Sequence, residues 1–266
     1  MGILLMRLID ILNEYEEGST FYSIAYTLFH HFDEIQSMSI QEVAHMCHVS
    51  KSTISKFVRA IHFEDYNDFK NEAEFKENRF LNQHNYNDNI IQYILSHNKQ
   101  DYIQNIIQDL KALSSINMDT IKEIASMIHQ YPVICAFGTL FSQLGALDLQ
   151  YKLAYNHKFI MSFVNDVKQD EYLKNNKDEG VIIIYSNSGH YLDRYQVSSF
   201  QEKKSYQFKN KKVILITSNQ EMLNHPQVDI CLLYQHTSDI QTHNYIYPLI
   251  NDFIVSEYRK FLNREL

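Results

Sequence analysis

The segment from Ser39 to Phe63 constrains the fold of this chain more than any other, because its pattern is typical of two short helices joined by a tight turn. Ser39 and Glu42 form a capping-box pattern, in which a serine hydroxyl and a glutamate three residues later satisfy the free amides at a helix start. The pattern predicts a helix that begins after Ser39 and ends at a turn over Cys47–Val49. Within this turn, His48 takes the position that needs a left-handed or bridging backbone, where histidine is enriched among non-glycine residues.

The second predicted helix of this pair has two distinct faces. Ser50 caps it, and apolar residues at spacing i, i+3, i+4 and i+7 place one face in a core. These apolar residues are Ile54, Phe57, Val58 and Ile61. The other face carries short hydroxyl residues that allow close approach at the helix start, and cations that suit phosphates or guanine edges. The predicted DNA-binding residues are Lys51, Ser52, Thr53, Ser55, Lys56 and Arg59.

The distribution of charge supports this interpretation. The chain is acidic, with 24 Lys and Arg against 32 Asp and Glu, yet no acidic residue occurs between Glu42 and Glu64. An acid-free surface helix in an acidic protein is a candidate for contact with nucleic acid. An ordinary amphipathic helical hairpin would show the same caps and apolar face, and remains the alternative at this point.

From about Phe21 to Phe75 the sequence resembles the helix-turn-helix domain of the RpiR family of bacterial transcriptional regulators. The resemblance rests on Ser39-Ile40-x-Glu42-Val43-Ala44, Val49-Ser50-x-Ser52-Thr53-Ile54, and Phe57-Val58-Arg59 through Phe63, Tyr66, Phe69 and Lys70. Two departures concern loops. His48 replaces the usual turn glycine, and the connection from Ile61 to Tyr66 lacks the glycines that are common there.

The length of 266 residues and the 45% hydrophobic content indicate two domains. Residues 1–78 read as helices throughout, and the Asn-rich stretch that follows favours an exposed linker over 79–100. Residues 101–266 form the second predicted domain. The chain has 3 cysteines, widely spaced, so we expect neither disulfides nor a zinc module, and a cytoplasmic location. The apolar run Ile3–Leu12 is broken by charges, so we expect neither a signal peptide nor a membrane span.

The second domain alternates short apolar runs with helical patterns, which is typical of βαβ units. The runs are Val133–Phe137, Phe159–Phe163, Val181–Tyr185, Val213–Thr217 and Ile230–Tyr234. They predict a five-stranded, mostly parallel sheet flanked by helices, closed by a last helix over Tyr245–Leu262.

Ligands of open parallel sheets bind beyond the carboxyl ends of the strands, where loops lead into helix starts. Three loops carry suitable neutral donors: Gly138–Ser142, Ser186–Gly189 and Thr217–Asn219. Together they could hold a phosphate. A plain strand-to-helix turn would prefer the same Ser, Asn and Gly residues and remains open for Ser186–Gly189.

From about Ile121 to Ile254 the chain resembles the SIS (sugar isomerase) domain, a phosphosugar-binding fold that follows the helix-turn-helix domain in the RpiR family. The family places Ser-x-Ser-Gly at the phosphate, which implies roles for Ser186 and Ser188, and for Ser142 in the first loop. A glycine expected near Leu140 is absent, and Tyr191 stands where a threonine is common. The predicted phosphosugar-binding residues are Ser142, Ser186, Asn187, Ser188, Gly189 and Thr217.

We therefore expect an all-α helix-turn-helix domain followed by an α/β SIS domain, in a regulator of sugar uptake or metabolism genes that senses a phosphorylated sugar. The predicted DNA-binding helix carries few cations, and the chain has a net charge of -8, so one helix-turn-helix domain offers few phosphate contacts. We therefore expect two such domains on a palindromic operator, and hence a homodimer or higher even oligomer. We expect no cofactor, metal or membrane partner. Two alternatives stay open: a phosphosugar isomerase that uses Glu171 or His190 as its base, or a regulator whose SIS domain only dimerises.

Overall fold

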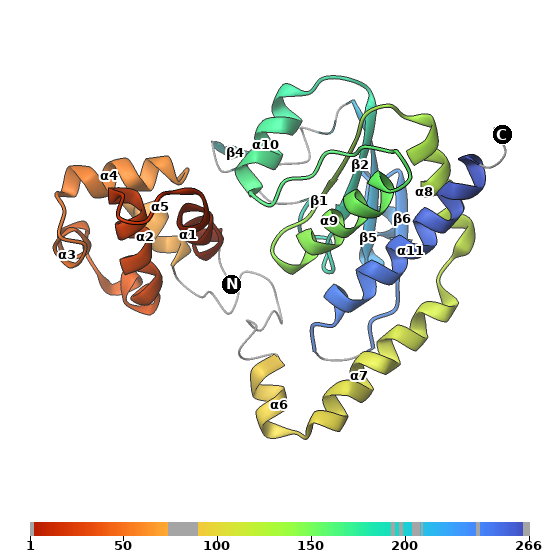
Figure 1. The fold of residues 1–266 in the computed structure, drawn as a ribbon, viewed down its shortest axis with the longest axis horizontal. Coiled ribbons are helices and arrows are strands. Elements are labelled where there is room, and N and C mark those ends of the chain that lie inside the picture. Colours follow the sequence, from red (N-terminus) through yellow and green to blue (C-terminus); the bar gives the residue numbers. More distant parts are fainter. Residues whose placement is uncertain are drawn as a thin grey trace. The chain divides into compact units, whose positions relative to one another are not determined.

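The computed structural model in Figure 1 describes residues 3–73, 90–192, 195–196, 199–203, 208, 210–237 and 240–262. The chain separates into two compact units, one of residues 1–85 with 197–200 and one of residues 86–196 with 201–266. Most of the Asn-rich stretch in the predicted linker lies outside the described residues. Within the described ranges, no helix is long and apolar enough to cross a membrane.

The regular elements of residues 3–73 in the N-terminal unit are all helices. Its α-helices are α1 (Ile3–Glu14), α2 (Thr20–His30), α3 (Ile40–Met46), α4 (Lys51–Ala60) and α5 (Tyr66–Glu72), with a 3-10 helix, η1 (Phe32–Ser37), after α2. Each α-helix sends at least one fully buried side chain into a single core, as Leu8, Ile24, Val43, Phe57 and Phe69 illustrate. The helices thus share one apolar centre, because each buries the stripe that its 3.6-residue period places on one side.

The turn between α3 and α4 has the predicted geometry. The Ser39 amide donates to Glu42 Oε2 at 2.7 Å and the Glu42 amide donates to Ser39 Oγ at 3.3 Å, which completes the capping box. His48 adopts a left-handed backbone with φ of 53°, and the Val49 amide donates a hydrogen bond to the Ala44 carbonyl at 2.9 Å. These bonds satisfy groups that the end of α3 would otherwise leave free.

The end of α4 is held by a buried arginine from α1. Arg7 Nη1 donates to the carbonyls of Ile61 and His62 at 3.0 and 2.9 Å, and its guanidinium lies 4.5 Å from the centre of the Phe63 ring. A cation is favourable where helix carbonyls end unpaired and over an aromatic face. His62 is also left-handed, with φ of 65°, in the connection that lacks glycine.

The C-terminal unit is built on a parallel sheet in the order β1-β2-β5-β6. Its strands are β1 (Ile134–Phe137), β2 (Gly180–Tyr185), β5 (Lys211–Thr217) and β6 (Ile230–Leu233). A separate hairpin pairs β3 (Tyr195–Gln196) with β4 (Ser199–Lys203).

The prediction of five strands in the parallel sheet is wrong, because Phe159–Phe163 forms a single bridge to β1 rather than a strand. Met161 exchanges backbone hydrogen bonds with Ile134 and Ala136 at 2.8 and 2.9 Å. The Ser162 hydroxyl then donates to the Ala136 carbonyl at 2.9 Å. That carbonyl is the acceptor a continuing parallel ladder would use, so the side chain ends the pairing after one residue.

Helices cover both faces of this sheet (Figure 1). The helices of this unit are α6 (Gln92–Ser96), α7 (Lys99–Ala112), α8 (Met118–Gln130), α9 (Phe141–Ala154), α10 (Asp166–Asn175) and α11 (His243–Leu262), with short 3-10 helices η3 (Leu113–Ser115) and η5 (Gln220–Asn224). α6 buries no residue and lies apart from the sheet, beside α7 (Figure 1). Residues of α8, α9 and α11 pack with Ile183 on one face, and residues of α10 and η5 pack with Ile184 on the other. β2 is therefore buried on both sides, as expected for a central parallel strand.

Candidate DNA-binding helix and candidate ligand site

The side of α4 that faces away from the core carries the predicted DNA-binding residues. Lys51, Ser52, Lys56 and Arg59 are exposed, and Ser55 is half-buried. At 100° per residue these five side chains fall within about 140° of the helix circumference. No ion pair involves the three cations within the part of the chain that the structure describes. Their charge is therefore available to an external anion.

Two of the predicted residues also build the start of α4. The Ser50 hydroxyl caps the helix by accepting from the Thr53 amide at 3.2 Å, and it lies 2.8 Å from the hydroxyls of both Ser52 and Thr53. Thr53 is half-buried, so it contributes to this cap more than to the exposed face. A capped N-terminus holds the first turn rigid, which is the part of a recognition helix that meets base edges.

The loop Ser186–Gly189 follows β2 directly, as the sequence predicts. Gly189 has φ of 81°, and an added Cβ would lie 2.5 Å from Met222 Cγ, so only glycine fits. Ser186 Oγ accepts from the Tyr191 amide at 3.3 Å, and Ser188 Oγ accepts from the His190 amide at 3.4 Å. Both hydroxyls keep their own proton for a further acceptor, because these bonds use only an oxygen lone pair.

Asn187 and Thr217 join this loop to the neighbouring strand end. Thr217 is fully buried, and its hydroxyl donates to the Asn187 carbonyl at 2.9 Å. The Asn187 side-chain oxygen accepts from Ser218 Oγ at 2.8 Å and from the Tyr234 hydroxyl. The structure thus brings the two loops together, with the polar atoms of Thr217 turned to the protein interior.

The first loop is closed over by side chains. Ser142 is buried in the first turn of α9, and Leu140 before it has φ of 53° and ψ of -125°, a backbone that suits glycine. The Gly138 amide donates to Gln143 Oε1 at 2.8 Å, and Gln169 Nε2 donates to the Gly138 carbonyl at 2.9 Å. The amide and carbonyl of Gly138 are therefore already paired within the protein.

Tyr191, which replaces the expected threonine, belongs to the same network. Its hydroxyl donates to Gln169 Oε1 at 2.7 Å. The phenol thus reaches past the position of a threonine hydroxyl and ends on an internal partner. At the carboxyl end of β2, the hydroxyls of Ser186 and Ser188 each keep a proton that they can donate.

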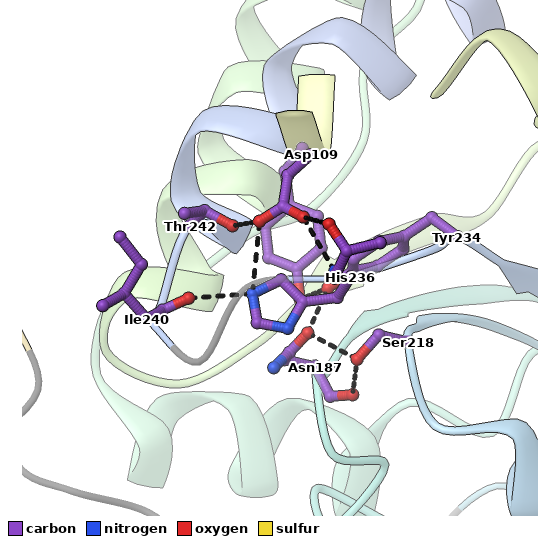
Figure 2. A network of polar contacts seen from close by, with 9 residues as sticks. Asp109, Asn187, Ser218, Tyr234, His236, Ile240 and Thr242 are labelled. Carbon is purple, nitrogen blue, oxygen red and sulfur yellow. Dashed lines mark hydrogen bonds and ion pairs between the residues drawn. The ribbon is translucent and has the colours of Figure 1, made fainter. Parts of the chain in front are cut away.

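A second polar network, missed by sequence reasoning, lies beside the ligand loop (Figure 2). It consists of two groups of contacts, one around Asn187 and one around Asp109 of α7, and its labelled members are Asp109, Asn187, Ser218, Tyr234, His236, Ile240 and Thr242. The backbone from Tyr234 to Thr237 joins the two groups. Asp109 is fully buried and accepts from the Thr237 amide and hydroxyl, both at 2.7 Å, and from the Thr242 hydroxyl at 2.6 Å. No local sequence signal identifies Asp109, because Thr237 and Thr242 lie 128 and 133 residues away along the chain.

Burial fixes the protonation of the groups around this network. Loss of solvent raises the pKa of Tyr234 well above its usual value and raises that of Tyr247 to about 12. Burial also lowers the pKa of His243 to about 4, with the nearby His236 lowering it further. At neutral pH the two phenols are therefore hydrogen-bond donors, and the His243 imidazole is neutral.

The residues named for an isomerase are placed as follows. Glu171 is exposed on α10, and His190 is half-buried directly after the ligand loop. In the described residues, no three His, Cys, Asp or Glu side chains gather so as to hold a metal ion.

Comparison with known proteins bears on both units. Residues 19–76 match the family model described as the helix-turn-helix domain, rpiR family. An uncharacterized HTH-type transcriptional regulator in the aarA 3′ region of Providencia stuartii is 27% identical over 177 residues, which are 65% of this chain and 61% of that protein. The chain thus matches less than two thirds of the length of this curated relative.

The fold is similar to that of one solved structure over nearly the whole chain. The Vibrio vulnificus NanR protein complexed with ManNAc-6P has a TM-score of 0.50 at 14% identity, over 98% of this chain and 93% of that chain. The sugar isomerase domain of an RpiR transcription factor from Sphaerobacter thermophilus has a TM-score of 0.47 at 12% identity, over 60% of this chain and 88% of that one.

The chain thus joins a helix-turn-helix domain that matches the rpiR family over residues 19–76 to an α/β domain with a parallel sheet. The predicted resemblance of about Phe21 to Phe75 to the RpiR helix-turn-helix domain is confirmed by the family match.

Proposed function

We propose that this chain is a transcriptional regulator that binds double-stranded DNA through α4. The observation that carries the proposal is the exposed, acid-free face with Lys51, Lys56 and Arg59 on a helix whose other side is fixed in the core. A helix of this kind fits the major groove, where cations meet phosphates and guanine edges. The family match over residues 19–76 supports the same role.

Removing single cations from α4 tests this proposal. Lys56→Ala and Arg59→Ala should each weaken binding to the DNA site that wild type selects from a random duplex library, and each should reduce the dependence of log affinity on log salt by about one. Fluorescence anisotropy at several salt concentrations measures both quantities. Lys122→Ala, which removes an exposed cation from α8 in the other unit, serves as the control. Unchanged affinity in both α4 variants would show that the DNA binds to a surface other than α4.

We further propose that the effector is a phosphorylated sugar bound at Ser186 and Ser188. Two hydroxyl donors at the carboxyl end of β2 are suited to phosphate oxygens, and they remain able to donate. The related fold of NanR, a protein solved with ManNAc-6P, supports this class of ligand. The genes under control would then serve sugar uptake or metabolism.

Thermal unfolding with added ligands tests the effector. A ligand at 100 times its Kd stabilises the folded state by about 2.7 kcal/mol. ManNAc-6P, glucose 6-phosphate and inorganic phosphate form the panel, and Ser188→Ala should reduce the response whereas Ser126→Ala on α8 should not. If none of the three stabilises wild type, the α/β unit serves assembly alone.

The absence of catalysis is part of the proposal. An isomerase would need a base held against the sugar carbons, and the exposed position of Glu171 argues against that role. Assays for aldose-ketose conversion on the same phosphates should give no turnover. Turnover that disappears in Ser188→Ala would favour the isomerase instead.

We also propose that the active form is a homodimer that reads a palindromic site. The outer face of α9 supports this, because Leu144, Tyr151 and Tyr155 lie on one stripe and are 53%, 68% and 87% exposed. Phe159 beyond the helix is 68% exposed. Apolar patches of this kind on a soluble domain often mark contact with another chain. Two heads related by a two-fold axis would double the phosphate contacts of a single head.

A further inference from the structure

We propose that Asp109 couples the ligand site to α7, the helix that precedes the strands of the α/β unit along the chain. Asp109 would do so by holding residues 234–237 and 240–242, which lie between β6 and α11, against that helix. The inference rests on the proposed sensing function and names how its signal leaves the site. Asp109 is a positioning residue in this scheme and does not touch the ligand.

The contact is polar, and the Asp109 carboxylate in it is fully buried. Asp109 accepts two hydrogen bonds from Thr237, an exposed residue, and one from the buried Thr242, and His236 Nε2 lies 3.7 Å from Asp109 Oδ2. His236 Nε2 also lies 2.9 Å from the Ile240 carbonyl oxygen (Figure 2). A buried carboxylate needs such donors, so the loop and the helix stay together only while these donors point at Asp109.

Fully buried apolar side chains contribute little to fixing α7 at this position, although the Tyr102 hydroxyl lies 3.3 Å from the Tyr245 hydroxyl of α11. Asp109 is the one fully buried residue among the fourteen of α7, while Ile103 on the same helix is 49% exposed. Leu110 packs at the edge of the core, and Leu113 in η3 after the helix is buried. An attachment that depends on directional hydrogen bonds can be released by a small movement of its donors, unlike a broad apolar contact.

The other end of the loop reaches the ligand site. Tyr234 donates to the side chain of Asn187, the residue between Ser186 and Ser188. The Tyr234 backbone amide also donates a hydrogen bond to the Thr217 carbonyl at 3.0 Å. From Tyr234 to Thr237 is three residues of chain. A ligand that reorders Asn187 would therefore act on the donors of Asp109 within a short, continuous path.

The consequence is a link between two equilibria. Suppose that the bound ligand and Asp109 favour different conformations of residues 234–237 and 240–242. Ligand bound at Ser186 and Ser188 would then change how firmly α7 is held. Because α7 follows the helix-turn-helix unit along the chain, DNA affinity changes with it, and linkage makes the effect reciprocal.

Asp109→Asn tests the coupling without a large change in shape. The amide keeps one acceptor but presents a donor toward the Thr237 and Thr242 groups. The control is Asp101→Asn, the same change in the exposed first turn of α7, where Asp101 contacts Asn98. The measurement is affinity for the selected DNA site with and without ManNAc-6P, glucose 6-phosphate or inorganic phosphate, read with the thermal response to the same probes.

We expect the probe to change the DNA affinity of wild type and Asp101→Asn by the same factor, about 5- to 150-fold as is typical of coupled sites. In Asp109→Asn this factor should fall to near one while the probe still raises thermal stability. A merely structural role would lower stability and leave the factor unchanged, which would overturn the coupling alone. A wild type that responds to none of the probes would overturn the sensing function, and the coupling with it.

A second pair of variants covers the case in which Asp109→Asn does not fold. Thr242→Val keeps the shape but removes one donor to Asp109, whereas Thr242→Ser retains the hydroxyl. The factor should fall in the valine variant and be restored in the serine variant. Equal factors in both would contradict the proposal.

Discussion

At the scale of single residues, the left-handed positions show how this chain replaces glycine. His48 and His62 both have positive φ at connections where the family uses glycine, and both sites tolerate a side chain because they are exposed. The residue preference at these two turns therefore depends on backbone conformation rather than on packing. A left-handed backbone costs an L-residue about 1–2 kcal/mol.

His48→Gly should raise the free energy of unfolding of the N-terminal unit by about 1 kcal/mol, because it removes the Cβ conflict without removing buried surface. His45→Gly, three residues earlier in α3, should instead lower it by about 1 kcal/mol through lost helix propensity. Urea unfolding followed by circular dichroism compares the two. A loss of stability in His48→Gly would mean that the imidazole makes a contact worth more than the strain.

His243 gives stability a dependence on pH. Its pKa is lowered to about 4 in the folded chain, against about 6.5 for an unfolded histidine. The unfolded state thus binds the proton first, so this contribution is fully present above about pH 6.5 and is lost as pH falls toward 4.

His243→Gln should therefore flatten the decline in the free energy of unfolding between pH 6.5 and 4. The upper limit of the effect is about 3 kcal/mol, since each pKa unit corresponds to about 1.4 kcal/mol. His45→Gln, at an exposed site, should leave the wild-type slope. Unfolding midpoints across a pH series provide the measurement, and identical slopes in all three proteins would contradict the burial of a neutral imidazole.

At the scale of elements, the packing of α9 on α11 depends on one glycine. A Cβ at Gly145 would lie 2.9 Å from the Tyr247 Cβ and from a ring carbon of Tyr185. The close approach lets Asn251 Nδ2 donate to the Gly145 carbonyl at 2.8 Å, while Asn251 Oδ1 accepts from the Tyr185 hydroxyl. The two helices and β2 therefore meet at a point where no methyl group fits.

Gly145→Ala should lower the free energy of unfolding by about 1–3 kcal/mol, although alanine alone favours a helix. Glu123→Ala, at an exposed position of α8, should have an effect within about 0.5 kcal/mol. Thermal unfolding of the two variants distinguishes them. A stabilised Gly145→Ala would show that α9 and α11 can move apart without cost.

Most elements could be predicted from the sequence, and the exception is informative. The helices α3 and α4 and the four buried strands follow from caps and periodicity, which are interactions between near neighbours. Phe159–Phe163 has the composition of a strand, yet the Ser162 hydroxyl occupies the acceptor that a fifth strand would need. Local pattern does not contain that information.

At the scale of the whole molecule, the exposed stripe of α9 predicts how copies assemble. Tyr151→Lys combined with Tyr155→Lys should convert a dimer to a monomer, because like charges would face each other across a two-fold axis. Sedimentation velocity checks the mass. Tyr26→Lys, at an exposed tyrosine of α2, is the matched control. A dimer that persists in the double variant would place the interface elsewhere.

The same distinction between near and distant contacts separates what sequence and structure contribute here. The sequence determined the helix-turn-helix pair, its exposed cationic face and the glycine turn of the ligand loop, since each depends on residues within one or two turns of chain. Only the tertiary structure decided which hydroxyls remain able to donate, because Tyr191 and Thr217 are satisfied by partners 22 and 30 residues away. It also decided that Asp109 is buried against a loop more than a hundred residues later. Burial of a polar group depends on what folds over it, and no local pattern records that.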